Sequence, residues 1–386
     1  MLNRSLLAAA ALAGLTGAAF AQDAYNVGLT GALTGPAAGT YAPAVDGLRI
    51  YIDKVNAAGG VNGKKINLIL LDDSAQPAKA AANATRLVTD DKVVLLLNAS
   101  LSSTYAPIMA ESQKANVPLI FASSVCPKTV YPPANALQFC TTAFAANYDS
   151  RAVLDFVKAT AKEPVKLGLS AMAIPISRGE IDYAEELSKT LGMTPVSKQI
   201  IPPPTPDYTP FATLIKDAGA NWVYSWAPWV TQVRTLEGLR RLGWTGDYVA
   251  WAHLEAENEL ARLKDGKFFV VGANALFQED LPIQKEIAAA AKAAGSQYPV
   301  NQMTEGWIAG MVIEAALKAS GWPANAEKIT ASLSNLKVDL KGLRGGELQW
   351  TKDNHFRTKQ YYRVYRWDEA KAAIVRVQDW KAFDVK

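Results

Sequence analysis

Residues 25–73 read YNVGLTGALTGPAAGTYAPAVDGLRIYIDKVNAAGGVNGKKINLILLDD, and this stretch decides the fold. The apolar residues 25–29 predict a short strand, which is followed by a loop of small residues. Apolar residues then recur at helical spacing over 41–55, and Gly59 and Gly60 end the predicted helix. A second apolar strand at 66–71 completes a unit of strand, loop, helix and strand.

The same alternation continues along the chain. It predicts further strands at 93–97, 117–122, 165–171, 196–200, 222–226, 248–251 and 267–273, with helices between most of them. Short β-rich runs that alternate with helices are typical of parallel sheets. From Gly342 onward the pattern changes to alternating aromatic strands such as 360–367, which favours antiparallel pairing. The fold class is therefore α/β.

The length of the chain favours two lobes. Single hydrophobic cores stop growing near about 250–300 residues, and this chain has 386. The strand and helix rhythm also starts again with a helix near 149–160, where we expect the second lobe to begin.

The first residues predict an export signal. Arg4 precedes an apolar stretch, residues 6–15, and the small-residue triplet 19–21 predicts cleavage after Ala21. A membrane anchor is the alternative, but the stretch is broken by Gly14 and is shorter than the roughly 20 residues that span a bilayer. The cleavage site has no cysteine to which a lipid anchor could be attached. We therefore expect the mature chain to be free in the periplasm of a Gram-negative cell.

Charge indicates no macromolecular partner. The chain has 40 basic and 36 acidic residues, and the basic ones form no run. This balance speaks against binding of nucleic acid or of anionic lipid.

Cys126 and Cys140 are the two cysteines of the chain. An even pair in an exported protein favours a disulfide over a catalytic or metal site. Two separately buried thiols remain the alternative.

The common catalytic patterns are absent. The two histidines, His253 and His355, are too isolated for a zinc cluster, and no G-x-S-x-G nucleophile elbow occurs. The residues around Gly59 and Lys64 lack the spacing of a phosphate-binding loop. Asp72 and Asp73 end a strand, where a helix cap or a hinge contact is more common than catalysis. We expect neither an enzyme nor a metal or cofactor.

The loops after the strands are the candidate binding site, because ligands of open α/β sheets bind at the carboxyl ends of the strands. Ser102 and Ser103 precede a helix whose positive end favours an anion, although a plain N-cap explains them equally well. Arg178 could pair with a ligand carboxylate or stand in solvent. Four aromatic residues, which could wall a pocket or pack in a core, also stand at element ends: Tyr41, Trp226, Trp229 and Trp251.

Three stretches resemble the beginning of the leucine/isoleucine/valine-type periplasmic binding proteins that serve ABC importers. They are VGLTGALTGP at 27–36, DKVNAAGGVNG at 53–63 and LLDD at 70–73. The resemblance persists more loosely to GELQW at 346–350. It implies a type I periplasmic binding protein fold, in which two Rossmann-like lobes are joined by three hinge crossovers and close on a ligand.

The resemblance also implies where the lobes begin and end. We expect crossovers near Thr141, Ala273 and Lys341, so that lobe 1 comprises 22–141 and 274–340 and lobe 2 comprises 142–273 and 341–386. The closed form would dock on a membrane permease, and we expect a monomer.

The resemblance can be carried over residue by residue. In the first lobe, the positions that hold the ligand in amino-acid-binding members correspond to Ser102 or Ser103, Ser123 and the backbone of Val125, and Ser124 is a further candidate. In the second lobe the pocket tyrosine is missing, since the stretch 172–177 reads MAIPIS and puts Ile176 there. A gapless comparison puts Ala252 in place of the acid that pairs with the ammonium, although His253 or Glu255 could replace it.

A buried ammonium without a partner costs several kcal/mol, so the sequence favours a small organic acid, and an aromatic one in particular. A leucine-like apolar amino acid is the runner-up. A ligand-sensing regulator of the same fold is the alternative of another class, and it would lack the export signal.

Overall fold

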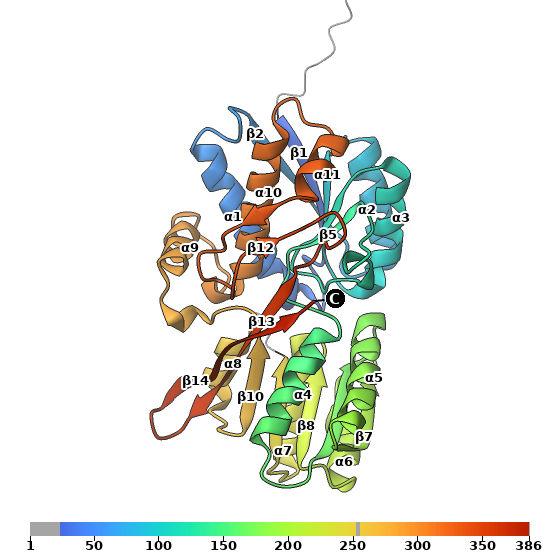
Figure 1. Ribbon diagram of the computed structural model, residues 1–386, viewed down its shortest axis with the longest axis vertical. Helices are drawn as coiled ribbons and strands as arrows, with labels where there is room; N and C mark the ends of the chain where they lie inside the picture. The colour runs from blue at the N-terminus through green and yellow to red at the C-terminus, as the bar shows by residue number, and fades with distance from the viewer. Residues whose placement is uncertain (1–23, 252–254, 386) are drawn as a thin grey trace, which may run out of the picture.

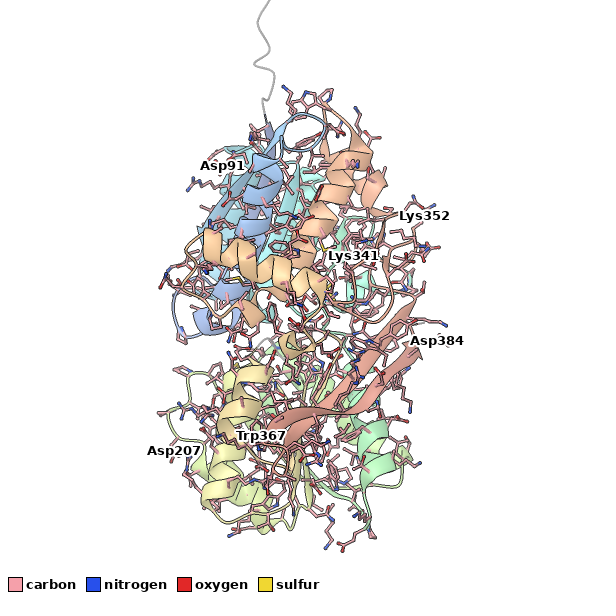
Figure 2. All side chains as sticks on the ribbon, turned by 90° about the vertical axis from the view of Figure 1, so that its left-hand side faces the viewer. Asp91, Asp207, Lys341, Lys352, Trp367 and Asp384 are labelled. Atoms are coloured by element: carbon pink, nitrogen blue, oxygen red, sulfur yellow. A yellow bond between two sulfur atoms is a disulfide. The ribbon has the colours of Figure 1, made fainter. Side chains whose placement is uncertain are left out.

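A computed structural model describes residues 24–251 and 255–385, and these residues form two bodies, each built around one main sheet (Figure 1). We call the body with the five-stranded sheet the first lobe and the body with the seven-stranded sheet the second lobe. Figure 2 shows the same division from the side, with Asp91 in the first lobe and Asp207 and Trp367 in the second. The predicted α/β class with parallel sheets is confirmed.

The first lobe contains a parallel sheet with the strand order β2-β1-β3-β4-β5. Its strands are β1 (Ala24–Gly31), β2 (Lys65–Asp72), β3 (Leu95–Ala99), β4 (Leu119–Phe121) and β5 (Gln138–Cys140). Its helices are α1 (Ala38–Ala57), α2 (Pro77–Thr89), α3 (Tyr105–Ala115), α9 (Pro282–Ala293), α10 (Thr304–Ser320) and α11 (Ala326–Leu333). The lobe also contains short 3-10 turns, which are η1 (Ser102–Thr104), η2 (Lys128–Val130), η3 (Phe277–Glu279) and η4 (Val300–Gln302). A short antiparallel pair is formed by β11 (Lys337–Val338) and β12 (Leu348–Gln349).

The second lobe contains a mixed sheet with the order β14-β13-β10-β9-β8-β6-β7. The parallel strands are β6 (Lys166–Met172), β7 (Thr194–Ile201), β8 (Trp222–Trp226), β9 (Asp247–Trp251) and β10 (Phe268–Gly272). The antiparallel strands are β13 (Lys359–Asp368) and β14 (Ala373–Asp384), as the aromatic alternation predicted. The helices are α4 (Tyr148–Thr160), α5 (Pro175–Thr190), α6 (Thr209–Asp217), α7 (Trp229–Arg241) and α8 (Ala256–Leu263).

The pattern of alternating side chains decides which face of each sheet meets which helices. Along β3, Leu95 and Leu97 lie in a core with α1 and α10, whereas Leu96 lies in a core with α2 and α3. This period of two is that of an extended strand buried on both faces. Among the described residues, no helix is long and apolar enough to cross a bilayer.

The segments that cross between the lobes meet at one buried guanidinium. Arg344 forms an ion pair with Glu305 of α10 at 2.7 Å, and both side chains are almost fully buried. Its Nε donates to Asn274 Oδ1 at 2.7 Å and its Nη1 donates to the carbonyl of Thr141. Residues 141 and 274 lie where we expect the first two crossovers, so the side chain of Arg344 ties both of these segments to α10.

The packing of residues 343–350 bears on the position of the third crossover. Leu343, Leu348 and Trp350 are buried in the core that also holds α1 and α10 of the first lobe, and the chain joins the second sheet only at Lys359. We therefore propose the division of lobes given above with this crossover moved from near Lys341 to beyond Trp350. The reason is that these apolar side chains find their core in the first lobe.

The predicted disulfide between Cys126 and Cys140 is present. The bond links the end of β5 to the loop after β4, with Cα atoms 5.6 Å apart and both residues fully buried. It thereby holds the loop that follows β4, just before the chain leaves the first lobe.

Candidate functional site

A cavity lies between the two lobes at the carboxyl ends of their parallel strands, where the sheet rule places ligands. Loops and helix starts of both lobes line it: Tyr41, Ser102, Tyr105, Val125, Phe144, Ile174, Ile176, Ser177, Trp226, Ala227, Pro228 and Trp251. The cavity measures about 20 Å³, which is room for about one water molecule. A larger molecule does not fit into the cavity in this arrangement of the side chains.

Aromatic side chains form one wall of this cavity. Phe144 and Trp251 pack edge to face with their ring centroids 4.0 Å apart, and Trp226 lies 6.2 Å from Trp251. Trp226 is oriented by its indole N–H, which donates to Asp149 at 3.1 Å. The side-chain amide of Gln232 in α7 forms two hydrogen bonds with the backbone of Trp251. It donates to the Trp251 carbonyl and accepts from the Trp251 N–H. The wall is thus a fixed aromatic surface.

Hydroxyl groups form the facing wall. Ser102 Oγ accepts a hydrogen bond from the backbone N–H of Ile176 across the cleft at 3.4 Å. Tyr105 donates to the carbonyl of Val125 at 2.7 Å. Burial raises the pKa of Tyr41, and the carboxylates of Glu255 and Asp73 raise it further, so its hydroxyl stays protonated.

Ser123 and Ser124 follow β4 but have different environments. The hydroxyl of Ser124 donates to Asn98 and accepts from the N–H of Ser100, so it serves the fold. Ser123 has a φ of 64°, is 2% exposed, and its hydroxyl has no hydrogen-bond partner among the described residues. A non-glycine residue in this left-handed region is strained, and such strain is common at binding sites.

A wider groove of about 700 Å³ adjoins the cavity, and Tyr41 and Pro228 belong to both. Trp229 and Glu255 line this groove rather than the cavity. Glu255 accepts a hydrogen bond from Thr40 of the first lobe at 2.9 Å, which is a second direct contact between the lobes. Arg262, at the outer part of the groove, is paired with Glu237 and Glu259.

The structure brings together Tyr41, Ser102, Val125, Ile176 and Trp226 of the residues predicted from the sequence. Other predicted residues lie elsewhere. Arg178 is exposed on α5, and Ser103 is half-buried beside Ser102, and neither lines the cavity. His253 lies outside the described residues, as does Ala252.

Sequence reasoning missed Tyr105 and Phe144, and it included Ser177 in a candidate loop, residues 173–178, without singling it out. Tyr105 and Phe144 lie outside the loops that directly follow the strands, and Phe144 enters from a crossover. Ser177 is the third residue of α5, and its position after β6 was the available signal. No group of three or more metal-ligating side chains occurs in residues 24–251 and 255–385.

Comparison with known proteins gives a family match over most of the chain. The family model described as "Periplasmic binding protein" matches residues 24–372. An "Amino acid binding protein" of Pseudomonas aeruginosa is 25% identical over 329 residues, which are 82% of this chain and 83% of that protein.

Two solved structures are similar in fold. One is a branched-chain amino acid ABC transporter protein from Thermus thermophilus with bound valine, at 18% identity and a TM-score of 0.79 over 94% of this chain and 97% of that one. The other is a solute-binding protein of an ABC transporter from Rhodopseudomonas palustris in complex with 3,4-dihydroxybenzoic acid, at 19% identity and a TM-score of 0.79 over 94% and 98%. At this identity both matches bear on the fold alone.

Proposed function

Because this chain belongs to the periplasmic binding protein family, we propose that it captures a small organic acid between its lobes and delivers it to the membrane permease of an ABC importer. The lobes separate to admit the ligand and close on it. The protein binds the ligand without converting it.

The cavity between the lobes is the observation that carries this proposal. Its lining comes from both lobes, so a ligand held there contacts both and favours the closed arrangement by its differential affinity. Interlobe contacts such as Thr40 with Glu255 already join the two walls.

The chemistry of the lining supports an acid. Hydroxyls and the starts of α5 and α7 offer hydrogen-bond donors and positive helix ends, which suit a carboxylate. Within the described residues, the lining of the cavity holds no carboxylate that could pair with an ammonium. The wall formed by Phe144, Trp226 and Trp251 suits a flat ring.

An apolar α-amino acid is the alternative ligand. The name of the Pseudomonas relative, an amino acid binding protein, favours it. It would need an anionic partner for its ammonium, and Glu255 in the adjoining groove is the described carboxylate that could serve.

Calorimetric titration distinguishes these ligands. The amine-free acids benzoate, cinnamate and 3,4-dihydroxybenzoate should each be compared with leucine and valine. We expect at least one acid to bind at least tenfold more tightly than leucine, which corresponds to about 1.4 kcal/mol. If leucine binds tenfold more tightly than every acid, the ligand is an amino acid and the ammonium has a partner that our comparison missed.

Export remains part of the proposal. Residues 1–21 lie outside the described residues, and N-terminal sequencing of the protein recovered from the periplasm tests cleavage after Ala21. Recovery of the bound acid unchanged, by mass spectrometry of the purified protein, tests binding without conversion.

A further inference from the structure

Ser177 has an unusual environment for a serine. It is 0% exposed, it lines the cavity between the lobes, and its hydroxyl has no hydrogen-bond partner among the described residues. Burying a hydroxyl without a partner costs free energy, because its hydrogen bonds to water are lost and not replaced. The fold alone therefore gives no reason for a hydroxyl at this position.

The start of α5 offers two N–H groups near the cavity, those of Ile176 and Ser177, because Pro175 has none and Arg178 donates to the carbonyl of Ile174. Ser177 is the third residue of the 16-residue helix α5, and the residue before the helix, Ile174, provides no side-chain cap. The first N–H groups of a helix have no partner within it, and they give this end of the helix a partial positive charge. The N–H of Ile176 meets only Ser102 Oγ, at the long distance of 3.4 Å.

Two buried carboxylates of the second lobe have hydrogen-bond partners of their own. Glu180, one turn further along α5, accepts from the N–H groups of Asn147 and Ser150. Asp149 accepts from Trp226 and Tyr362. The Ser177 hydroxyl and the weakly bonded N–H of Ile176 thus line a cavity whose described lining supplies no anion.

We infer that Ser177 and the first N–H groups of α5 form an anchor in the second lobe for a ligand carboxylate, which Ser102 contacts from the first lobe. This inference rests on the proposed function and adds the group that makes closure depend on an acid. The carboxylate takes the place of the direct contact between Ile176 and Ser102. It is held by charge-assisted hydrogen bonds from both lobes, whereas a neutral amide of the same shape gains less from the positive helix end.

The test compares Ser177→Ala with the unmodified protein in calorimetric titrations. The probes are benzoate, cinnamate and 3,4-dihydroxybenzoate, together with the primary amides benzamide and cinnamamide. We expect Ser177→Ala to weaken the bound acids by about tenfold or more and the amides by clearly less, since charge-assisted bonds are roughly twice as strong as neutral ones. The melting temperature without ligand should stay the same or rise, because the variant removes a hydroxyl that lacks a partner.

Ser188→Ala is the matched control. Ser188 lies in the same helix and is equally buried, but its hydroxyl donates to the carbonyl of Glu185 at 2.7 Å. This variant should lower the melting temperature and leave the affinity for acids unchanged.

Each other outcome contradicts the inference. Equal affinity of Ser177→Ala and the unmodified protein for the acids overturns the anchor and leaves the proposed function intact. An equal loss for acids and amides overturns its preference for carboxylate, and a melting temperature that falls as in Ser188→Ala shows that the hydroxyl serves the fold. If the unmodified protein binds none of the three acids, the proposed ligand class and the anchor fail together.

Discussion

Cys126 and Cys140 join the loop after β4 to the last strand of the first sheet. The bond closes a short loop, with a sequence separation of 14, and the chain-entropy account assigns about 3 kcal/mol to a loop of this size. It thereby stabilises the segment that carries Val125 to the cavity.

We expect the double variant Cys126→Ser, Cys140→Ser to lose about 3 kcal/mol of unfolding free energy, measured by urea titration. Thiol labelling of the unreduced, unfolded chain should find no free thiol. Labelling of both cysteines would contradict the bond in the exported protein.

Asp149 and Glu180 are two buried carboxyls close to the aromatic wall. Burial raises the pKa of Asp149 well above its usual range, and the neighbouring Glu180 raises it further. Burial also raises the pKa of Glu180, although hydrogen bonds from Asn147 and Ser150 oppose the rise. Lys128, which lowers the pKa of Glu180, and the buried tyrosines 131, 224 and 362 complete the ionisable surroundings.

Because the folded protein raises these pKa values, the unfolding free energy should fall as the pH rises. A group of this kind stabilises the fold fully below its unfolded pKa, about 4, and loses that stabilisation as the pH rises through the folded value. The two carboxyls titrate as a pair, so the change of unfolding free energy with pH reflects both of them.

We therefore expect Glu180→Gln to lose less unfolding free energy than the unmodified protein when the pH is raised from 4 to 8. Urea titrations at several pH values measure this difference in slope. Glu186→Gln, at an exposed position of the same helix, is the control and should keep the original slope. An unchanged slope in Glu180→Gln would show that the pair does not titrate in this range.

Helices α1 and α10 pack unusually closely in the first lobe. A Cβ atom on Gly306 would overlap the carbonyl of Ala44, and one on Gly310 would overlap the ring of Tyr51. Tyr51 in turn packs edge to face on Trp307 at 4.9 Å. Glycine is required here because the backbones approach each other, even though it weakens a helix.

Gly306→Ala should cost about 1–3 kcal/mol of unfolding free energy, because the added methyl group must push α1 away. Gly179→Ala in α5 is the comparison, since nothing lies within 4 Å of its added methyl group. That variant should gain up to about 1 kcal/mol from helix propensity. Chemical denaturation of both proteins tests the contrast, and equal effects would argue against the close packing.

Several hydrogen bonds and ion pairs join the two lobes. Arg344 and Glu305 tie the crossing segments together, and Arg357 adds a hydrogen bond to the carbonyl of Thr142 at 2.8 Å. Beyond these, Thr40 with Glu255 and Ser102 with Ile176 bridge the cleft. In addition, Arg363 of β13 pairs with Glu279 of η3, and Asn301 donates to Asn258 at 2.8 Å. A hinge motion that opens the cleft must keep or rearrange these contacts.

Small-angle scattering should show the particle contract when a tightly bound acid is added. The ligand contacts both lobes and therefore shifts the population toward the closed form. Leucine at a concentration where it does not bind is the control. An unchanged radius of gyration at saturating acid would contradict binding between the lobes.

The sequence by itself determined the local elements and the disulfide. The apolar run 25–29 lies within β1 (Ala24–Gly31), which is buried on both faces and needs continuous apolar residues whatever surrounds it. The run 66–71 lies within β2 (Lys65–Asp72), a half-buried strand at the edge of the sheet. The same alternation of strands and helices located the loops after the strands, which include Tyr41, Ser102 and Trp226 as candidate site residues. Short elements with weak patterns were missed, such as β5 and α8.

Only the tertiary structure decided which of these residues share a site. Ser177 and Arg178 are neighbours in sequence, yet the phase of α5 buries the first in the cavity and leaves the second in solvent. The contact of Ser102 with Ile176 joins residues 74 positions apart and exists only because the two lobes face each other. Local sequence patterns fix the backbone of each element, whereas burial and long-range contacts depend on how separate elements pack.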